Sequence, residues 1–215
     1  MPFGYPISLE VAGRRAVVIG SAAVWERKPD GLLAAGALVT VIAEGPAAAL
    51  ERLDSEGRAM IARRGYEPGD LAGAFVAVCS SDDAAERLAM YEEGKAAGVL
   101  MNVVDDLPHC DWAMPAIVRR GDLVLSIATG GRSPALAKRL RKRFSDEFGP
   151  EWAEATELLG DLRTETLPLL PDFRDRADRW SRALDLDELT TLVRDGHADE
   201  ARARLRERLV GDLPP

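Results

Sequence analysis

Short apolar runs alternate with helical patterns through the first half of the chain. Continuous, largely β-branched runs cover residues 16–19, 38–43, 74–79 and 99–104, with a weaker run at 60–62. Runs of this length bounded by glycine and polar residues are typical of strands buried on both faces. Helical patterns lie between them, ending for example at Gly36. The alternation predicts an α/β fold built on a Rossmann-type, doubly wound parallel sheet.

The ligand crevice of such a sheet lies beyond the carboxyl ends of its strands. Those ends carry Gly20, Glu44, Ser80 and Asp105. Glu44 follows Gly20 by 24 residues, a spacing that suits an acid binding the adenine ribose and favours NAD over NADP. The run Glu44-Gly45-Pro46 equally fits a plain turn.

The pattern changes after Asp105. Residues 106–111 are irregular, 114–118 are short and extended, and 123–128 form an apolar run between two glycine turns, which predicts a buried strand. Beyond residue 150 the spacing of apolar residues is helical throughout. We therefore expect a dinucleotide-binding domain at 1–113, a strand-rich segment at 114–149 and a helical C-terminal domain at 150–215.

A helix is predicted to start at Ser133 and Pro134, a good N-cap and a good first helical residue. Its apolar stripe is Leu136, Leu140, Phe144 and Phe148, and its other face carries Arg132, Lys138, Arg139, Arg141, Lys142 and Arg143. The free N–H groups of the helix start, together with Gly130 and Gly131, favour an anion. The strip is either a site for a polyanionic small molecule or a solvated helix face.

The amino-acid composition limits the classes of partner that the protein is expected to bind. The 215 residues include 28 basic and 36 acidic side chains, a formal net charge of -8, which argues against nucleic acid as the main partner. No apolar run approaches the roughly 20 residues that span a bilayer, and the start of the sequence has no signal-peptide pattern, so we expect a cytoplasmic protein without membrane contact. Cys79 and Cys110 lack metal-type spacing, so we expect thiols and no metal site.

Several motifs resemble the precorrin-2 dehydrogenase/sirohydrochlorin ferrochelatase family, whose members stand alone or form the N-terminal module of siroheme synthase. They are Gly20 in its strand-turn-helix context, Glu26-Arg27-Lys28, residues 32–37, Asn102-Val103-Val104-Asp105, Met114-Pro115 and residues 129–137. The resemblance covers about residues 5–180 and implies NAD-dependent oxidation of precorrin-2 to sirohydrochlorin in siroheme biosynthesis. It also implies insertion of ferrous iron in some members, and a homodimer joined through residues 114–148 with the active site between subunits.

The resemblance also assigns site residues. It places the cofactor on Gly20, Ala22, Ala23, Val24, Glu44, Gly45 and Ser80, and the tetrapyrrole on Thr129, Gly130, Gly131, Arg132, Ser133 and Lys138. Asp105 matches the essential aspartate and would take the proton released when the substrate loses a hydride. The alternative is that Asp105 caps a turn, and Asp106 is its nearest competitor as the base.

Two further side chains near these motifs have open roles. The Thr129 hydroxyl either contacts substrate or caps the glycine turn. His109 is either a proton carrier or iron contact, or a surface histidine, which is the interpretation we favour.

The first turn departs from the family pattern. Ala22 replaces a fingerprint glycine, Trp25 replaces a small residue, and Pro29 disfavours a helix started near Ala23 and favours one started at Lys28. Two functional classes remain: an NAD-dependent dehydrogenase, or a tetrapyrrole chelatase or binding module with a degenerate dinucleotide site. A third, an NAD-sensing or unrelated Rossmann protein, predicts no affinity for tetrapyrroles.

Overall fold

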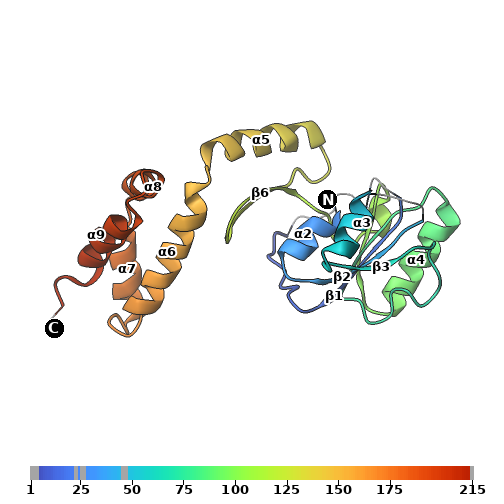
Figure 1. The fold of residues 1–215 in the computed structure, drawn as a ribbon, viewed down its shortest axis with the longest axis horizontal. Helices are drawn as coiled ribbons and strands as arrows, with labels where there is room; N and C mark the ends of the chain where they lie inside the picture. Colours follow the sequence, from blue (N-terminus) through green and yellow to red (C-terminus); the bar gives the residue numbers. More distant parts are fainter. Residues whose placement is uncertain (1–4, 22–23, 25–27, 45–47, 214–215) are drawn as a thin grey trace. The chain divides into compact units, whose positions relative to one another are not determined.

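A computed structural model describes residues 5–21, 24, 28–44 and 48–213. The chain divides into two compact units, Met1–Met114 and Pro115–Pro215. The first contains the sheet, and the second contains a strand pair and a series of helices (Figure 1). The predicted further boundary between residues 149 and 150 falls within the second unit and stays a prediction.

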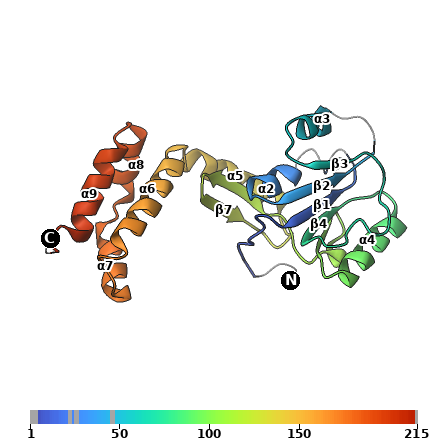
Figure 2. The same ribbon diagram turned by 60° about the horizontal axis from the view of Figure 1, so that its bottom comes forward.

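The first unit is a five-stranded parallel sheet. Its strands are β1 (Arg15–Ile19), β2 (Leu38–Ile42), β3 (Met60–Ala62), β4 (Val76–Cys79) and β5 (Leu100–Val103), in the order β3-β2-β1-β4-β5 (Figure 2). The helices in the described part of this unit are α2 (Lys28–Ala34), α3 (Ala48–Ser55) and α4 (Ala84–Ala96), with a 3-10 helix η1 at Leu107–His109. This order confirms the predicted Rossmann-type sheet and puts its topological switch point between β1 and β4.

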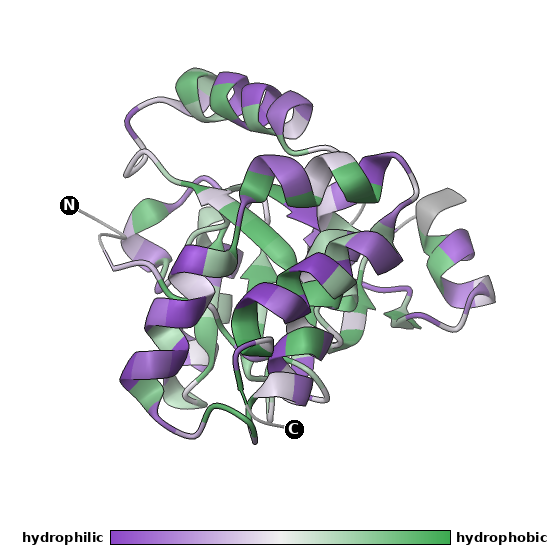
Figure 3. Cartoon of the chain, turned by 90° about the vertical axis from the view of Figure 1, so that its left-hand side faces the viewer, coloured by the Kyte–Doolittle hydropathy of each residue, from purple (hydrophilic) through white to green (hydrophobic). Residues whose placement is uncertain are grey.

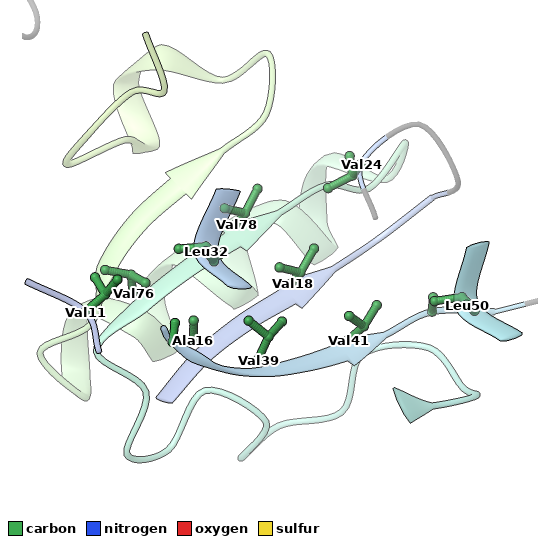
Figure 4. Packing of buried hydrophobic residues seen from close by; sticks show 12 residues of the cluster. Val11, Ala16, Val18, Val24, Leu32, Val39, Val41, Leu50, Val76 and Val78 are labelled. Carbon is green, nitrogen blue, oxygen red and sulfur yellow. The ribbon is translucent and has the colours of Figure 1, made fainter. Parts of the chain in front are cut away.

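Apolar side chains cover both faces of the sheet. On one face, Val18, Val41 and Val78 of three neighbouring strands pack with Leu32 of α2 and Leu50 of α3 (Figure 4). On the other face, alternate residues of the same strands pack against Met90 of α4 and against Leu71. Burial on both faces explains why the strands are continuous apolar runs in the sequence.

The outer edge of β5 is covered by backbone and side-chain groups of the segment that follows η1. Cys110 Sγ accepts a hydrogen bond from Val103 N at 3.2 Å and donates to Val103 O at 3.1 Å. Asp111 N donates to Met101 O at 2.7 Å, and the indole N–H of Trp112 bonds to a third β5 carbonyl at 3.0 Å. These contacts occupy the strand edge, which would otherwise present unpaired backbone groups.

The second unit starts with an antiparallel strand pair, β6 (Ala116–Arg120) and β7 (Leu123–Ile127), followed by helix α5 (Pro134–Glu147). The prediction of a strand at residues 123–128 is confirmed for Leu123–Ile127, but the prediction that this strand is buried is wrong. In β7 only Ile127 is buried, and Val124 is 42% exposed. A two-stranded sheet has one face free, and β6 and β7 pack with α5 on the other.

Four helices complete the second unit: α6 (Glu151–Thr166), α7 (Phe173–Ala183), α8 (Leu186–Arg194) and α9 (Ala198–Val210). Their core includes Leu162, Leu205 and Leu209, with Ala155 and Val193 in an adjoining cluster. Purple and green bands alternate along most helices in Figure 3, as expected where one helix face is apolar and the other polar. The predicted helical character of residues 150–215 is confirmed for 151–210 in these four segments.

Candidate functional site

Gly20 and Ser80 end the two strands on either side of the switch point. Ile19 and Cys79 are paired in register, so Gly20 and Ser80 lie opposite one another. Gly20 has a φ of 137°, and a Cβ at this position would lie 2.5 Å from Ser80 O and 2.9 Å from Ser80 Cβ. Only glycine fits, and the turn therefore offers bare backbone at the point where a dinucleotide approaches a Rossmann sheet.

Glu44 lies one strand further along the same edge, two residues after β2. Its side chain is exposed, and a Cβ added to Gly65 would lie 2.9 Å from Glu44 Oε1. The glycine thus gives the carboxylate room beside the loop that follows β3. An exposed acid at this edge can accept hydrogen bonds from ribose hydroxyls.

Asp105 occupies the turn after β5. It is exposed, and with a φ of 61° it has a left-handed backbone, which no other non-glycine among the described residues shares. Asp106 N closes the turn on Val103 O at 3.1 Å. Aspartate tolerates this conformation better than most residues, but left-handed backbone still costs about 1–2 kcal/mol. The carboxylate is accessible at the same edge as Gly20 and Ser80.

A cluster that sequence patterns did not indicate lies beside Asp105. Asp106 Oδ2 is 2.9 Å from His109 Nδ1 and 3.6 Å from Arg87 Nε. His109 Nδ1 is buried and is not aligned for a hydrogen bond to that oxygen or to another described residue, so the contact is an ion pair when the imidazole is protonated. The ring also lies against Tyr91, with centroids 4.6 Å apart.

His109 is therefore only partly exposed at the surface, and its functional role stays a prediction. Its side chain is 31% exposed and has partners on two sides, α4 and the turn after β5. The signal in the sequence was only a histidine three residues after an aspartate, a spacing too common to stand out. Asp106 is also less suited than Asp105 to be the base, because its carboxylate is engaged.

Several predicted cofactor residues follow β1 or β2. Of these, Ala22, Ala23 and Gly45 lie outside the described residues, as does Trp25. Val24 is described: its side chain is 3% exposed within the apolar cluster, and its N–H donates to Ser21 O at 2.9 Å. Helix α2 is described from Lys28, directly after residues outside the described set, so the predicted helix start stays a prediction.

The predicted substrate residues belong to the second unit and form the entry to α5. Thr129 Oγ1 accepts from Ser133 N at 3.2 Å, and Ser133 Oγ accepts from Leu136 N at 3.2 Å. The predicted N-cap at Ser133 is thus confirmed. Gly130 and Gly131 have φ of 58° and 76°. The Thr129 hydroxyl serves the turn as an acceptor and keeps its own hydrogen free to donate.

The basic strip of α5 is open to solvent. No residue of α5 is fully buried, and Leu136 at the start of the apolar stripe is 49% exposed. Lys142 pairs with Asp146 at 2.9 Å. Among the described residues, no carboxylate lies within 4.0 Å of the other cations of the strip, Arg132, Lys138, Arg139, Arg141 and Arg143. These charges are available to an anionic ligand.

The two cysteines pack within the first unit. Cys79 is buried in β4, and burial raises the pKa of its thiol to about 12. Cys110 is half-buried along β5, and burial likewise raises the pKa of its thiol. Within the described ranges, none of the helices has the length and apolar character needed to cross a membrane.

Comparison with known proteins agrees with this geometry. Residues 7–116 match a family model described as "Putative NAD(P)-binding". The chain is 31% identical over 205 residues to siroheme synthase 1 of Pectobacterium atrosepticum, covering 95% of this chain and 42% of that protein. It is 32% identical over 202 residues to siroheme synthase of Methylococcus capsulatus, covering 94% and 42%.

The structure also resembles a solved one titled "SirC, precorrin-2 dehydrogenase". The TM-score is 0.61 at 24% identity, and the match covers 95% of this chain and 96% of the other. The likeness extends across the strand pair and the C-terminal helices as well as the sheet. The chain spans less than half the length of the siroheme synthases that it matches.

Proposed function

The chain belongs to the precorrin-2 dehydrogenase family of NAD(P)-binding proteins, and we propose that it oxidises precorrin-2 to sirohydrochlorin with NAD in the formation of siroheme. One observation carries the proposal. Gly20, Ser80 and Asp105 follow β1, β4 and β5, three neighbouring strands of one parallel sheet. A bare glycine turn at the switch point and an accessible carboxylate one strand away thus share the carboxyl edge of the sheet.

The residues of this edge suit a dinucleotide. Gly20 leaves no side chain between the ends of β1 and β4, and Glu44 offers a carboxylate beside Gly65. We assign the pyrophosphate to the turn from Gly20 through Ala22, Ala23 and Val24, and the ribose to Glu44 and Gly45. Ser80 would line the far side of the turn. Bound there, NAD would supply a hydride acceptor.

Asp105 is the proposed base. Oxidation of the tetrapyrrole releases a hydride and a proton, and the proton needs an acceptor within hydrogen-bond reach. Asp105 has an exposed carboxylate at the correct edge of the sheet. It would take the proton and pass it to water.

The α5 strip is the proposed substrate surface. Precorrin-2 carries eight carboxylate side chains. Lys138 lies on α5 and Arg132 in the turn before it, and the exposed cations of the strip have few intramolecular partners. Thr129, Gly130, Gly131 and Ser133 form the turn that presents the free N–H groups at the helix start. The opposite charges of strip and substrate favour this interpretation over a solvated face.

Three finer points also belong to the proposal. The protein acts as a homodimer joined through residues 114–148, works in the cytoplasm, and also inserts ferrous iron, with Asp105 accepting a pyrrole proton. The exposed apolar side chains of β6 and β7 support the dimer.

A second candidate is a chelatase or tetrapyrrole-binding module without efficient NAD binding. The substitutions Ala22, Trp25 and Pro29 favour it, and of these the structure describes Pro29, which is buried in α2. The two candidates share Asp105 and the basic strip, so only the dinucleotide turn separates them.

The test is a pair of titrations with the purified chain, one with NAD and one with sirohydrochlorin, followed by turnover of precorrin-2 monitored as NADH absorbance. Micromolar binding of NAD with NADH formation supports the dehydrogenase. Binding of sirohydrochlorin without binding of NAD favours the second candidate. Binding of NAD without affinity for either tetrapyrrole would refute both.

A further inference from the structure

Asp106 is held more firmly than its neighbours in the turn after β5. Its N–H donates to Val103 O at 3.1 Å, and its carbonyl accepts from His109 N at 3.0 Å. Its carboxylate lies between Arg87 and His109. Backbone and side chain are therefore fixed from several directions at once.

Asp105, the residue before Asp106, has no such restraint of its own. Asp105 is exposed and has left-handed backbone, and among the described residues its carboxylate has no ion-pair partner within 4.0 Å. A strained residue keeps such a conformation only when its surroundings impose it. Those surroundings are the Val103–Asp106 turn and the contacts of Asp106.

The Asp106 carboxylate does not serve the helix that it precedes. Asp106 is the N-cap residue of η1, yet its side chain makes no capping hydrogen bond. It turns instead toward Arg87 of α4, whose Nη1 donates to Ser81 O at 2.6 Å. Arg87 therefore joins the loop after β4, which carries Ser80, to the turn after β5, which carries Asp105.

We infer that Asp106 is a positioning residue, which acts through Arg87 and His109 to hold the Asp105 carboxylate in place relative to the Ser80 loop. The inference rests on the proposed function, because it takes Asp105 as the proton acceptor. Half-buried charges are costly to hold together unless they are well paired. Here the pairing joins the loops that follow β4 and β5, which are neighbours at the proposed cofactor edge.

The test uses Asp106→Asn, which keeps the shape of the side chain and removes its charge, and Arg87→Gln, which breaks the same pair from α4. Single-turnover oxidation of precorrin-2 with enzyme in excess resolves slow rates. We expect each variant to lower the rate about 10- to 100-fold, the scale on which small misplacements act, with KM for NAD within about twofold of the parent. Two separate variants keep the test valid if one of them fails to fold.

The double variant Asp105→Asn with Asp106→Asn separates positioning from a general structural role. If Asp106 acts through Asp105, the double variant should be no slower than Asp105→Asn alone. The matched control is Asp111→Asn, whose carboxylate binds Met101 N at 3.0 Å and Lys95 at 2.9 Å on the same segment. It should change thermal stability and leave the rate unchanged.

Parent-like rates in folded Asp106→Asn and Arg87→Gln would overturn the inference, as would additive losses in the double variant. A different result would contradict the proposed function. If Asp105→Asn keeps the parent rate, Asp105 is not the base. If Asp105→Asn is inactive and Asp106→Asn is not impaired, the assignment of Asp105 as the base is kept and only the positioning role of Asp106 is refuted.

Discussion

Gly20 and Ser80 approach so closely that a methyl group on Gly20 would lie 2.5 Å from the Ser80 carbonyl oxygen. The contact joins the ends of β1 and β4 and needs both the positive φ of Gly20 and the absence of its side chain. The same two strand ends face the proposed cofactor, so stability and binding depend on one contact.

Gly20→Ala should therefore lower both the stability of the fold and the affinity for NAD. Strained backbone and overpacking each cost about 1–3 kcal/mol, and we expect the free energy of unfolding to fall by about 2–4 kcal/mol in denaturant titrations. Affinity for NAD should fall with it. The control is Gly57→Ala, where φ is 63° but no atom lies within 4 Å of the new Cβ. Equal losses in the two variants would show that backbone strain alone, without the Ser80 contact, explains the effect.

Asp105→Asn should abolish steady-state oxidation of precorrin-2, leaving only a residual rate that single-turnover measurement resolves, and leave the fold intact. The substitution keeps shape and hydrogen-bonding capacity, and asparagine tolerates the left-handed backbone at this position. Circular dichroism and thermal unfolding should match the parent while NADH formation is lost. Near-parental turnover of the variant would contradict the assignment of Asp105 as the base.

The sheet could be predicted because each of its elements is encoded by residues that lie close together in the sequence. Each buried strand is a contiguous run, and caps such as Asp83 and Ser133 act on residues two or three positions away. The error in β7 has the same origin. A run of apolar residues does not reveal whether a second layer covers both of its faces, and here one face is open.

The cluster beside Asp105 could not be predicted in this way. Arg87 and Asp106 are far apart in sequence and belong to different elements, and they meet only because β4 and β5 are neighbours. Cys110 likewise seemed a thiol without a role, and its contact with Val103 depends on β5 being an edge strand. A single side chain that contacts a different element leaves no periodic pattern in the sequence.

Two carboxylates hold the loop between β3 and β4. Asp70 accepts hydrogen bonds from Arg64 at 2.6 and 2.8 Å, and these lower the pKa of Asp70. Glu93 accepts from Tyr66 at 2.5 Å, from Leu71 N at 2.8 Å and from a second backbone N–H at 3.0 Å. Burial alone would raise the pKa of Glu93, but the three donors outweigh it and the pKa is lowered.

Acid should therefore weaken this unit. Because both folded-state pKa values lie below those of the unfolded chain, about 3.9 and 4.3, the stabilisation is complete above about pH 5 and is lost as pH falls through the folded values. Glu93→Gln and Asp70→Asn should each cost about 1.5–3 kcal/mol at pH 7, and the difference from the parent should shrink below pH 4. Denaturant unfolding from pH 3 to 7 measures this, with exposed Glu92→Gln as control. A pH-independent difference would contradict the assignment.

The strand pair should join two copies of the chain. Ile117 and Val124 lie on the outward face of the pair, where pairing sets Ile117 beside Ser126 and Val124 beside Arg119. They are 38% and 42% exposed. We expect a dimer by sedimentation at micromolar concentration, and a monomer after Val124→Lys, because a buried unpaired charge is costly. Phe173→Lys, at a 73% exposed position on α7, should leave the dimer intact. A monomeric parent would refute the prediction.

The last prediction concerns the turn between Gly20 and Pro29. A helix start aimed at the pyrophosphate supplies charge-assisted hydrogen bonds of about 1.5–3 kcal/mol each, so every bond lost weakens binding about 10- to 150-fold. Ala22, Trp25 and Pro29 depart from the family pattern in the sequence. The triple variant Ala22→Gly, Trp25→Ala and Pro29→Ala should tighten NAD binding and raise oxidation at limiting cofactor.

Affinity for sirohydrochlorin is the internal control for this variant, because Asp105 and the α5 strip are unchanged. Calorimetric titrations of parent and variant with each ligand separate the two effects. A gain for NAD alone would show that the natural turn limits cofactor binding and would favour the second candidate function. If the parent already binds NAD at micromolar concentration and the variant binds no better, the natural turn holds the cofactor through other backbone groups, and the dehydrogenase proposal stands with an altered fingerprint.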